Sequence, residues 1–363
     1  MSLKLLHIAD VHLDAPFRWL GAKGQEQRRQ LKETFRKTID LALAERVDCL
    51  LIAGDLFDSN SPAQDTVDLV QGQLARLACP VFILPGTHDC LDEACVYRRA
   101  ELGAAHIHLF DAEHAAFAVA GLDLVVHGRA NASKTSRLSP LRDLRPSPSA
   151  RYNVALAHGS LVRPGTEDDF PIAEADLAAG MDYVALGHWH TYRQCGGGRA
   201  CYSGPPELLA EGEEGRALLV ELGRGEPRLE PRRVSQRRCA RLDLPLDGLR
   251  SAEEVAEALR TQRDPALVLG AVLSGLKPLD LVLNVDEMAR DLAPHFFALR
   301  LVDRSHPALT PAEIAAFPEH TVLGQYARRL GERIAAAGGE EERRLAETAL
   351  QLGLALLRGR RVL

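Results

Sequence analysis

Five short apolar runs of this chain each pass directly into a loop that opens with Asp, His or Gly. The runs read LKLLHIA, DCLLIAG, CPVFILPG, YNVALAHG and DYVALGH. Apolar runs of this length, bounded by glycine or proline, are typical of buried strands. Active residues of such sheets gather on loops at the carboxyl ends of the strands. The pattern therefore predicts one polar site that is assembled from five separate segments.

The spacing of the runs predicts the fold class. Up to about residue 85 the apolar runs alternate with helical patterns, at residues 25–46 and from about Pro62, which indicates a βαβαβ order. From residue 105 onward strand-like runs predominate. We expect an α/β (α+β) fold, a β-sandwich of two sheets flanked by helices, over residues 1–235. The segment 131–150, rich in Ser, Pro and Arg, is the clearest long loop.

A second pattern begins after residue 235. Residues 236–306 alternate strand-like and helical segments and predict a small α/β cap domain. Residues 307–363 predict a helical C-terminal region, with Thr310 as N-cap and Pro311 at the first helical position. The last segment, LAETALQLGLALLRGRRVL, is more apolar than a free surface helix. It is expected to pack either on the core or on a partner.

Composition excludes several classes of protein. No run of the chain approaches the ~20 apolar residues that cross a bilayer, and the amino terminus lacks the pattern of a secretory signal. The seven cysteines form no CxxC pair, which favours reduced thiols over disulfides or a zinc ribbon. We expect a cytoplasmic protein that does not bind membranes.

The five loops carry residues that bind divalent cations. They contain the motifs Asp10-x-His12, Gly54-Asp55, Gly86-Thr87-His88-Asp89, His158-Gly159 and Gly187-His188-Trp189-His190. A single histidine at the end of a strand is more often structural than a ligand, but five such motifs together indicate a metal site. A mixture of His and Asp suits Mn or Fe, whereas structural zinc would favour thiolates.

In this order the motifs resemble those of the calcineurin-like metallophosphoesterases. The resemblance implies two divalent cations, Mn first, with Fe, Mg and Zn as alternatives. One cation would be held by Asp10, His12, Asp55 and His190, and the other by Asp55, Thr87, His158 and His188. The resemblance also makes His88 a catalytic residue outside the metal shell, with Asp89 orienting its imidazole. Two cations suit phosphodiester hydrolysis because they stabilise charge on both the attacking and the leaving oxygen.

Thr87 departs from the family pattern, in which Asn occupies this position. The substitution replaces a carboxamide oxygen with a shorter hydroxyl, and it predicts a weaker second cation site. Alternatively, a water fills the gap and little is lost.

Within this superfamily the segments HIADVHLDAPF, AGDLFDSNSP and LGHWH resemble SbcD-type exonuclease subunits, most closely those of the YhaO type. The resemblance implies manganese-dependent DNA cleavage in DNA repair, as a 3′ to 5′ exonuclease with some endonuclease activity. It also implies docking of the helical tail on an SMC-like coiled-coil ATPase of the SbcC or YhaN type. Homodimerisation is left open.

The net charge of -6 argues against a uniformly basic DNA-binding surface. Local basic segments could track phosphates, and the candidate DNA contacts are Arg137, Arg142, Arg237 and Arg238. Each such run could equally be a solvated face. Trp189 could stack on a nucleotide or pack against the sheet edge. Asp14, Phe17 and Asp58, which follow ligand motifs, are interpreted as structural.

Two other functions compete with the nuclease. The first is a calcineurin-like phosphodiesterase or phosphatase that acts on a small molecule, a lipid or a phosphoprotein. The second is a weakly active or non-catalytic scaffold subunit, which Thr87 would favour. The segments beyond residue 235 favour the nuclease, because a minimal phosphatase would not need them.

Overall fold

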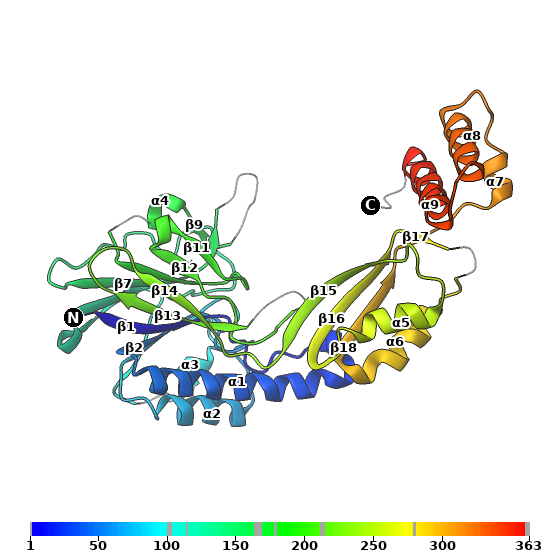
Figure 1. Ribbon diagram of the computed structural model, residues 1–363. Coiled ribbons are helices and arrows are strands. Elements are labelled where there is room, and N and C mark those ends of the chain that lie inside the picture. Colours follow the sequence, from blue (N-terminus) through cyan, green and yellow to red (C-terminus); the bar gives the residue numbers. More distant parts are fainter. Residues whose placement is uncertain are drawn as a thin grey trace. The chain divides into compact units, whose positions relative to one another are not determined.

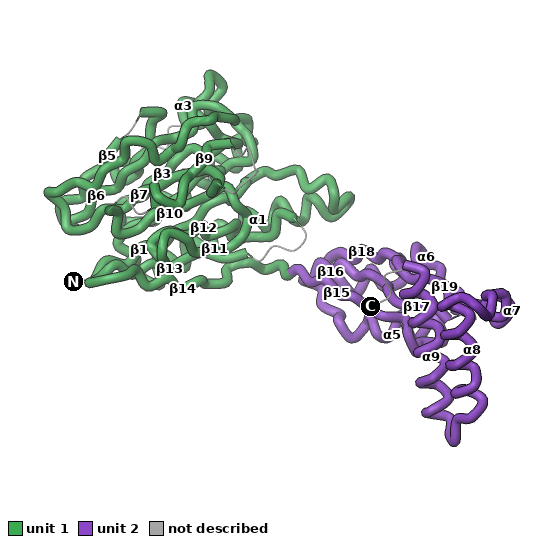
Figure 2. Tube along the Cα trace, turned by 90° about the horizontal axis from the view of Figure 1, so that it is seen from above, with its two compact units in different colours: residues 1–238 green, residues 239–363 purple. Residues whose placement is uncertain are grey.

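The computed structural model describes residues 2–99, 104–113, 115–162, 169–177, 180–210, 215–278 and 281–359. The chain divides into two compact units, residues 1–238 and 239–363 (Figure 2). The predicted domain boundaries after residues 235 and 306 stay predictions, and residues 360–363 of the predicted tail lie outside the described residues.

The first unit contains two six-stranded sheets (Figure 1). The first sheet has the order β14-β13-β1-β2-β3-β4, and the second has the order β11-β12-β10-β7-β6-β5. The strands of the first sheet are β1 (Leu3–Ile8), β2 (Cys49–Ala53), β3 (Val81–Leu84), β4 (Ile107–Leu109), β13 (Arg216–Leu222) and β14 (Arg228–Arg233). Those of the second are β5 (Ala115–Val119), β6 (Leu124–Gly128), β7 (Tyr152–His158), β10 (Tyr183–Gly187), β11 (Arg193–Cys195) and β12 (Ala200–Tyr202).

Helices cover the outer sides of this sandwich (Figure 1). The helical segments of the first unit are η1 (Arg18–Lys23), α1 (Gly24–Glu45), α2 (Gln64–Leu74), α3 (Val96–Arg99), η2 (Ala120–Leu122), α4 (Glu174–Leu177) and η3 (Gly196–Gly198). Two short strands, β8 (Ser160–Leu161) and β9 (Pro171–Ile172), pair in parallel. The expected two-sheet α/β sandwich is confirmed.

The strands that precede the five motifs are buried, apart from Lys4 of β1, which is half-buried. Every residue of β2, β3, β7 and β10 is buried, which explains why these strands read as continuous apolar runs. β1, β2 and β3 are parallel neighbours, and β7 pairs in parallel with β10. Their carboxyl ends therefore emerge together, at one edge of each sheet.

The second unit has a three-stranded sheet in the order β15-β16-β18. Its elements are β15 (Arg238–Pro245), α5 (Ala252–Arg260), β16 (Asp264–Ser274), β17 (Leu276–Lys277), α6 (Val285–Leu292), η4 (Ala293–His295), β18 (Phe296–Asp303), β19 (His306–Pro307), α7 (Pro311–Ala315), α8 (Val322–Ala335) and α9 (Glu340–Leu357). Thr310 caps α7 in a capping box with Glu313, as the sequence predicts.

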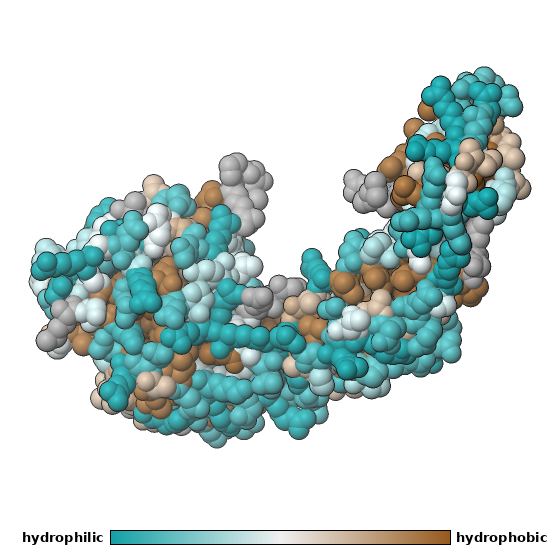
Figure 3. All heavy atoms as spheres, viewed as in Figure 1, coloured by the Kyte–Doolittle hydropathy of each residue, from teal (hydrophilic) through white to brown (hydrophobic). Residues whose placement is uncertain are grey.

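The apolar last helix packs only in part. Leu350 and Leu354 of α9 lie in a core shared with α8, whereas Leu345, Leu356 and Leu357 stay exposed. Figure 3 shows apolar side chains over these helices. None of the helices in the described residues is long and apolar enough to span a membrane.

Candidate metal centre

The predicted ligands lie where the buried strands end. Asp10 and His12 follow β1, Asp55 follows β2, Thr87 and His88 follow β3, His158 ends β7, and His188 and His190 follow β10. The imidazole Nδ1 of His158 lies 3.0 Å from the main-chain oxygen of Ala53, the last residue of β2. This hydrogen bond links the two sheets at the edge that carries the motifs.

The backbone is strained at four of the predicted ligands. Asp10, His12 and Asp55 have φ angles of 54°, 47° and 53°, and His188 has a φ angle of 103°. Non-glycine residues rarely adopt positive φ, and such strain is concentrated at functional sites, where the surrounding structure holds it. Here the N–H groups of Asp10 and His12 donate to the main-chain oxygens of Gly54 and Asp55, both at 3.0 Å.

Two glycines let the loops approach each other closely. A Cβ atom on Gly54 would lie 2.0 Å from Nδ1 of His158, and one on Gly86 would lie 2.2 Å from Oδ1 of Asp55. Any side chain at these positions would push the candidate ligands apart. The glycine of the Gly-Asp motif and that of the Gly-Thr-His-Asp motif therefore serve the packing of the site.

Asp55 lies between two groups of candidate ligands. Its Oδ2 atom is 3.6 Å from Nε2 of His12 on one side. On the other side the same atom is 3.1 Å from Nε2 of His158 and 3.2 Å from the hydroxyl of Thr87. We call Asp10, His12 and His190 the first subsite, and Thr87, His158 and His188 the second subsite. A carboxylate between two such sets is placed to bridge two cations.

The ligand atoms gather closely enough to hold ions. One ligand atom each from Asp10, His12 and His190 lies within 4.8 Å of the others, and the same holds for Asp10, Asp55 and His158. Among the described residues, Oδ2 of Asp10 and Nε2 of His12 are buried without a hydrogen-bond partner. Buried polar groups without partners are rare, and an ion is a common explanation. The residues present therefore fit a divalent cation.

The remaining members of the second subsite lie beside these groups. Thr87 Oγ1 is 3.5 Å from Nε2 of His158, so its hydroxyl lies in the cluster. The main-chain N–H of His188 donates to Oδ1 of Asp10 at 2.9 Å, and its ring lies edge-on to that of His158, with centroids 5.1 Å apart. The structure thus brings all seven predicted ligands to one place.

Asp55 and His158 form a buried ion pair. Burial alone would raise the pKa of the Asp55 carboxyl, but the charge and hydrogen bond of His158 outweigh it and hold this pKa well below its usual range. Burial alone would lower the pKa of His158, but the Asp55 carboxylate, with a smaller contribution from Asp10, raises it to about 9. The two side chains therefore stabilise each other's charged forms.

Asp58 is a functional candidate that the sequence interpretation assigned to structure. Its Oδ1 atom lies 3.1 Å from Nδ1 of His12, so it orients the imidazole whose Nε2 atom faces the cluster. Its main-chain oxygen accepts from Nδ1 of His88 at 3.0 Å. Groups behind a metal ligand fix its tautomer and orientation. The signal was available in the sequence, as an acidic side chain three residues after Asp55.

The expected role of Asp89 toward His88 is wrong. Asp89 is fully buried, and its Oδ2 accepts from the N–H groups of Leu56 and Phe57 and from the Tyr97 hydroxyl at 2.6–3.1 Å. Its Oδ1 accepts from the N–H of Gly86 at 2.7 Å. With both oxygens occupied in this way, Asp89 fixes the two loops that carry Asp55 and Thr87. The imidazole of His88 is oriented by residue 58 instead.

Trp189 packs within the fold. Its ring stacks on that of Tyr202, with centroids 4.8 Å apart and an interplanar angle of 19°. The guanidinium of Arg193 lies over the same indole, 5.1 Å from the ring centroid. Trp189 also contacts the apolar core beneath the second sheet. The structure therefore favours the packing role over nucleotide stacking for this residue.

The four candidate DNA contacts differ in exposure. Arg137 and Arg238 are exposed and Arg142 is half-buried. Arg237 is only 9% exposed, and its guanidinium pairs with Glu26 at 2.5 Å. The interpretation of Arg237 as a DNA contact is wrong, because its charge is already neutralised inside the first unit. Its position in a basic run gave no sign of this partner 211 residues away.

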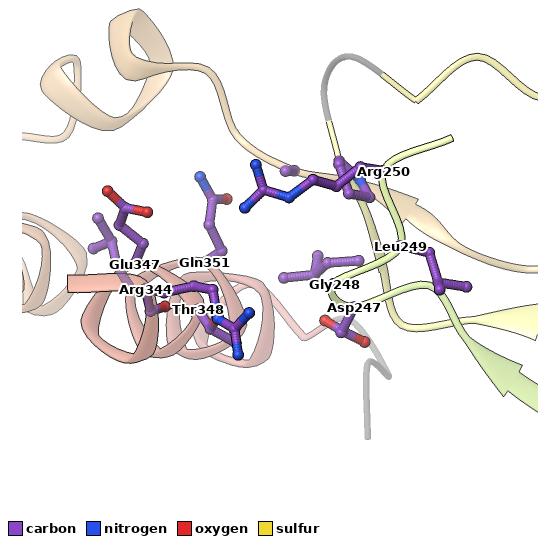
Figure 4. A pocket seen from close by; sticks show the side chains of 12 residues that line it. Asp247, Gly248, Leu249, Arg250, Arg344, Glu347, Thr348 and Gln351 are labelled. Carbon is purple, nitrogen blue, oxygen red and sulfur yellow. Dashed lines mark hydrogen bonds between the residues drawn. The ribbon is translucent and has the colours of Figure 1, made fainter. Parts of the chain in front are cut away.

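A cavity of about 480 Å³ opens directly beside the cluster. Its lining includes His12, His88, His190 and Asp58, together with the segment from Ala15 to Trp19 and Leu209. A larger cavity, about 750 Å³, lies in the second unit between residues 247–250 and α9 (Figure 4). Its lining contains no histidine or cysteine, so the smaller cavity is the one suited to hydrolysis.

The family model for calcineurin-like phosphoesterases matches residues 3–192. These residues contain both sheets' motif-bearing strands and all seven candidate ligands. The chain belongs to the calcineurin-like phosphoesterases, and it is a metallophosphoesterase.

Three known proteins show which members of this family the chain is similar to. The metallophosphoesterase YhaO of Bacillus subtilis (strain 168) is 31% identical over 203 residues, 52% of this chain and 49% of that protein. The chain thus matches about half the length of this relative. The DNA double-strand break repair protein Mre11 of Sulfurisphaera tokodaii is 26% identical over 313 residues, 81% of this chain and 79% of that one. The SbcD component of the nuclease SbcCD of Rhodobacter capsulatus is 26% identical over 316 residues, 71% of this chain and 75% of that protein.

Proposed function

We propose that this chain is a metal-dependent DNA nuclease that hydrolyses phosphodiester bonds at the cluster around Asp55. The observation that carries the proposal is the position of one buried carboxylate, Asp55, between two sets of candidate ligands, beside an open cavity. The distant relationship to a DNA repair protein and to a component of a nuclease, both over most of the chain, supports DNA as the substrate.

The chain supplies the ligands and a separate acid. Asp10, His12, Asp55 and His190 would hold one divalent cation, and Asp55, Thr87, His158 and His188 the other, with Mn as the first choice. A bound pair of cations stabilises the charge that develops on the attacking and leaving oxygens during phosphoryl transfer.

His88 is suited to proton transfer. Its side chain is half exposed beside the cavity, and Nδ1 faces the main-chain oxygen of Asp58, which accepts a hydrogen bond. This bond keeps a proton on Nδ1, so the proton that the imidazolium form can give to the substrate is the one on Nε2. We propose that His88 protonates the leaving oxygen or stabilises the phosphoryl group.

One experiment tests the proposal. Linear duplex DNA labelled at either end is incubated with Mn, Mg or a chelator, using the wild-type protein and His88→Ala. We expect label to be lost only with metal and only slowly in the variant, and the labelled end that disappears first gives the polarity, proposed as 3′ to 5′. Hydrolysis of bis(4-nitrophenyl) phosphate without loss of either DNA label would contradict the nuclease and favour a small-molecule phosphodiesterase.

The partner remains part of the same proposal. We propose that the tail, 307–363, docks on an SMC-like coiled-coil ATPase. The exposed Leu345, Leu356 and Leu357 of α9 support such a contact. Replacing Leu345 with Glu should abolish co-purification with the ATPase while leaving metal-dependent hydrolysis unchanged. Retained co-purification of the variant would contradict this docking surface.

Cytoplasmic location stays a prediction.

A further inference from the structure

We propose that the cavity beside His88 binds the nucleobase adjoining the reacting phosphate, with Trp19 as the stacking platform. The inference rests on the proposed hydrolysis of a nucleic acid phosphodiester and names the part of the substrate that the chain itself recognises. It concerns a binding surface formed by residues 15–19 and Leu209, outside the set of candidate ligands.

The cavity has the size and position of a nucleotide site. Its volume, about 480 Å³, lies within the range of small-molecule sites, roughly 300–1000 Å³. His12 and His190 of the first subsite form part of the lining, and so does His88. A phosphate held at these histidines would therefore have its nucleoside in the same cavity.

Trp19 is exposed but held in place. The residue is 44% exposed, which is unusual for so large an apolar group. Its indole Nε1 donates to the main-chain oxygen of Leu209 at 3.2 Å. An exposed ring that is anchored at one edge presents a flat surface with little entropy left to lose on binding. Such aromatic platforms stack on the bases of single-stranded nucleic acids.

The backbone before Trp19 is fixed as well. Phe17 is 3% exposed and adopts a φ angle of 46°. Its main-chain oxygen accepts from the N–H of Leu20 at 3.0 Å. A Cβ atom on Gly24 would lie 3.0 Å from that same oxygen, so the start of α1 also presses on this turn. A strained turn held from both sides keeps Trp19 at the edge of the cavity.

The lining predicts recognition of the face of a base and not of its edge. Ala15, Pro16, Phe17, Trp19 and Leu209 contribute apolar surface, and Asp58 is the single carboxylate of the lining. Because every base has a π face, binding by stacking tolerates all four bases. Arg18 also lines the cavity, and within the described part of the chain its guanidinium forms no hydrogen bond or ion pair. Its charge suits a neighbouring phosphate.

Tryptophan fluorescence tests binding without hydrolysis. The chain has two tryptophans, Trp19 and Trp189, so the difference between the wild-type protein and Trp19→Phe isolates the signal of Trp19. We expect dAMP to quench this signal and deoxyribose 5-phosphate, which lacks a base, not to quench it. Equal quenching by dAMP in both proteins would overturn the inference.

A substrate pair tests the same contact during hydrolysis. One oligonucleotide carries adenine at both terminal residues, and the other carries an abasic residue at both. We expect the wild-type protein to prefer the first, and Trp19→Ala to lower kcat/KM for it by roughly 5- to 150-fold, the worth of one stacked base. Trp19→Phe, which keeps a ring, should retain most of the preference.

The outcomes separate this inference from the proposed function. DNA hydrolysis with the same preference in the wild-type protein and in Trp19→Ala would overturn the base site and leave the nuclease intact. Quenching of Trp19 by dAMP in a protein that hydrolyses no DNA would support the base site and refute the nuclease. Unchanged circular dichroism and melting temperature show that both Trp19 variants are folded.

Discussion

The two subsites on either side of Asp55 differ in how completely the chain satisfies its own polar atoms. In the first subsite, Oδ2 of Asp10 and Nε2 of His12 are buried without a hydrogen-bond partner among the described residues. In the second, His158 pairs with Asp55 at 3.1 Å, and the Thr87 hydroxyl adds a contact at 3.2 Å. The first subsite thus contains buried polar atoms without a hydrogen-bond partner, whereas His158 and Thr87 of the second subsite are already paired with Asp55.

This difference has an energetic consequence. A buried polar atom left without a partner costs about 1–3 kcal/mol, so the first subsite is destabilising unless a cation occupies it. A cation that enters the second subsite must instead disrupt an existing buried ion pair. We therefore expect two unequal binding steps, the tighter at the first subsite. Four changes, ordered by the size of the expected effect, test this difference.

Asp55→Asn should have the largest effect, since it changes both subsites at once. Loss of one electrostatic group in an active site costs roughly 100- to 1000-fold in rate, and here we expect a loss of about 1000-fold or more. Calorimetric titration with Mn should show both binding steps weakened. A variant that keeps the tight step and activity within tenfold of wild type would show that Asp55 does not bridge.

His88→Ala should slow hydrolysis by about 100- to 1000-fold, within the usual contribution of a general acid or base. Because its Nδ1 is held by the main chain of Asp58, we expect the two Mn-binding steps to stay unchanged. This variant is the matched control for Asp55→Asn, with activity lost and cations retained. Loss of one Mn from the titration would instead make His88 a ligand.

Asp58→Ala should weaken the tight Mn-binding step by about 10- to 100-fold, as is typical when a group behind a ligand is removed. The reason is the 3.1 Å contact that orients His12 in the first subsite. Asp58→Asn keeps an acceptor and should restore part of the affinity. Asp14→Asn is the control: Asp14 accepts from the N–H of Ala63 and lies near Lys32, so Mn binding should not change.

Thr87→Asn should have the smallest effect and should act on the second subsite alone. A carboxamide oxygen reaches further than the hydroxyl, so we expect the weaker Mn-binding step to tighten by up to about tenfold, with a modest rise in turnover. The tight step serves as the internal control. If neither the weak step nor turnover changes, Thr87 is not a deficient ligand.

The ends of the strands could be predicted from the sequence because they depend on residues that are close together along the chain. Buried strands read as apolar runs, and each run ends at a motif whose glycine, aspartate or histidine is visible without a structure. The first three strands, the two helices between them and the later strands of the sandwich follow from the same periodicity. The capping box at Thr310 likewise depends on residues within one turn of helix.

Contacts between distant segments were not predictable in the same way. Asp89 adjoins His88 in the sequence, yet its carboxyl turns to the N–H groups of Leu56 and Phe57. Arg237 lies in a run of basic residues, yet it is buried against Glu26. Both contacts depend on which segments pack together in the folded chain. No local sequence pattern predicts that packing.

The sequence by itself determined which residue types stand at the ends of which strands, and hence the class of chemistry. Only the tertiary structure decided that Asp55 lies between two subsites, that Asp58 orients His12, and that Trp19 stays at the rim of a cavity. The physical reason is the separation along the chain of the residues that interact. Strand and helix patterns arise from neighbours along the chain, whereas a site depends on ångström-scale approach of loops, which the packing of two sheets and a strained backbone fix together.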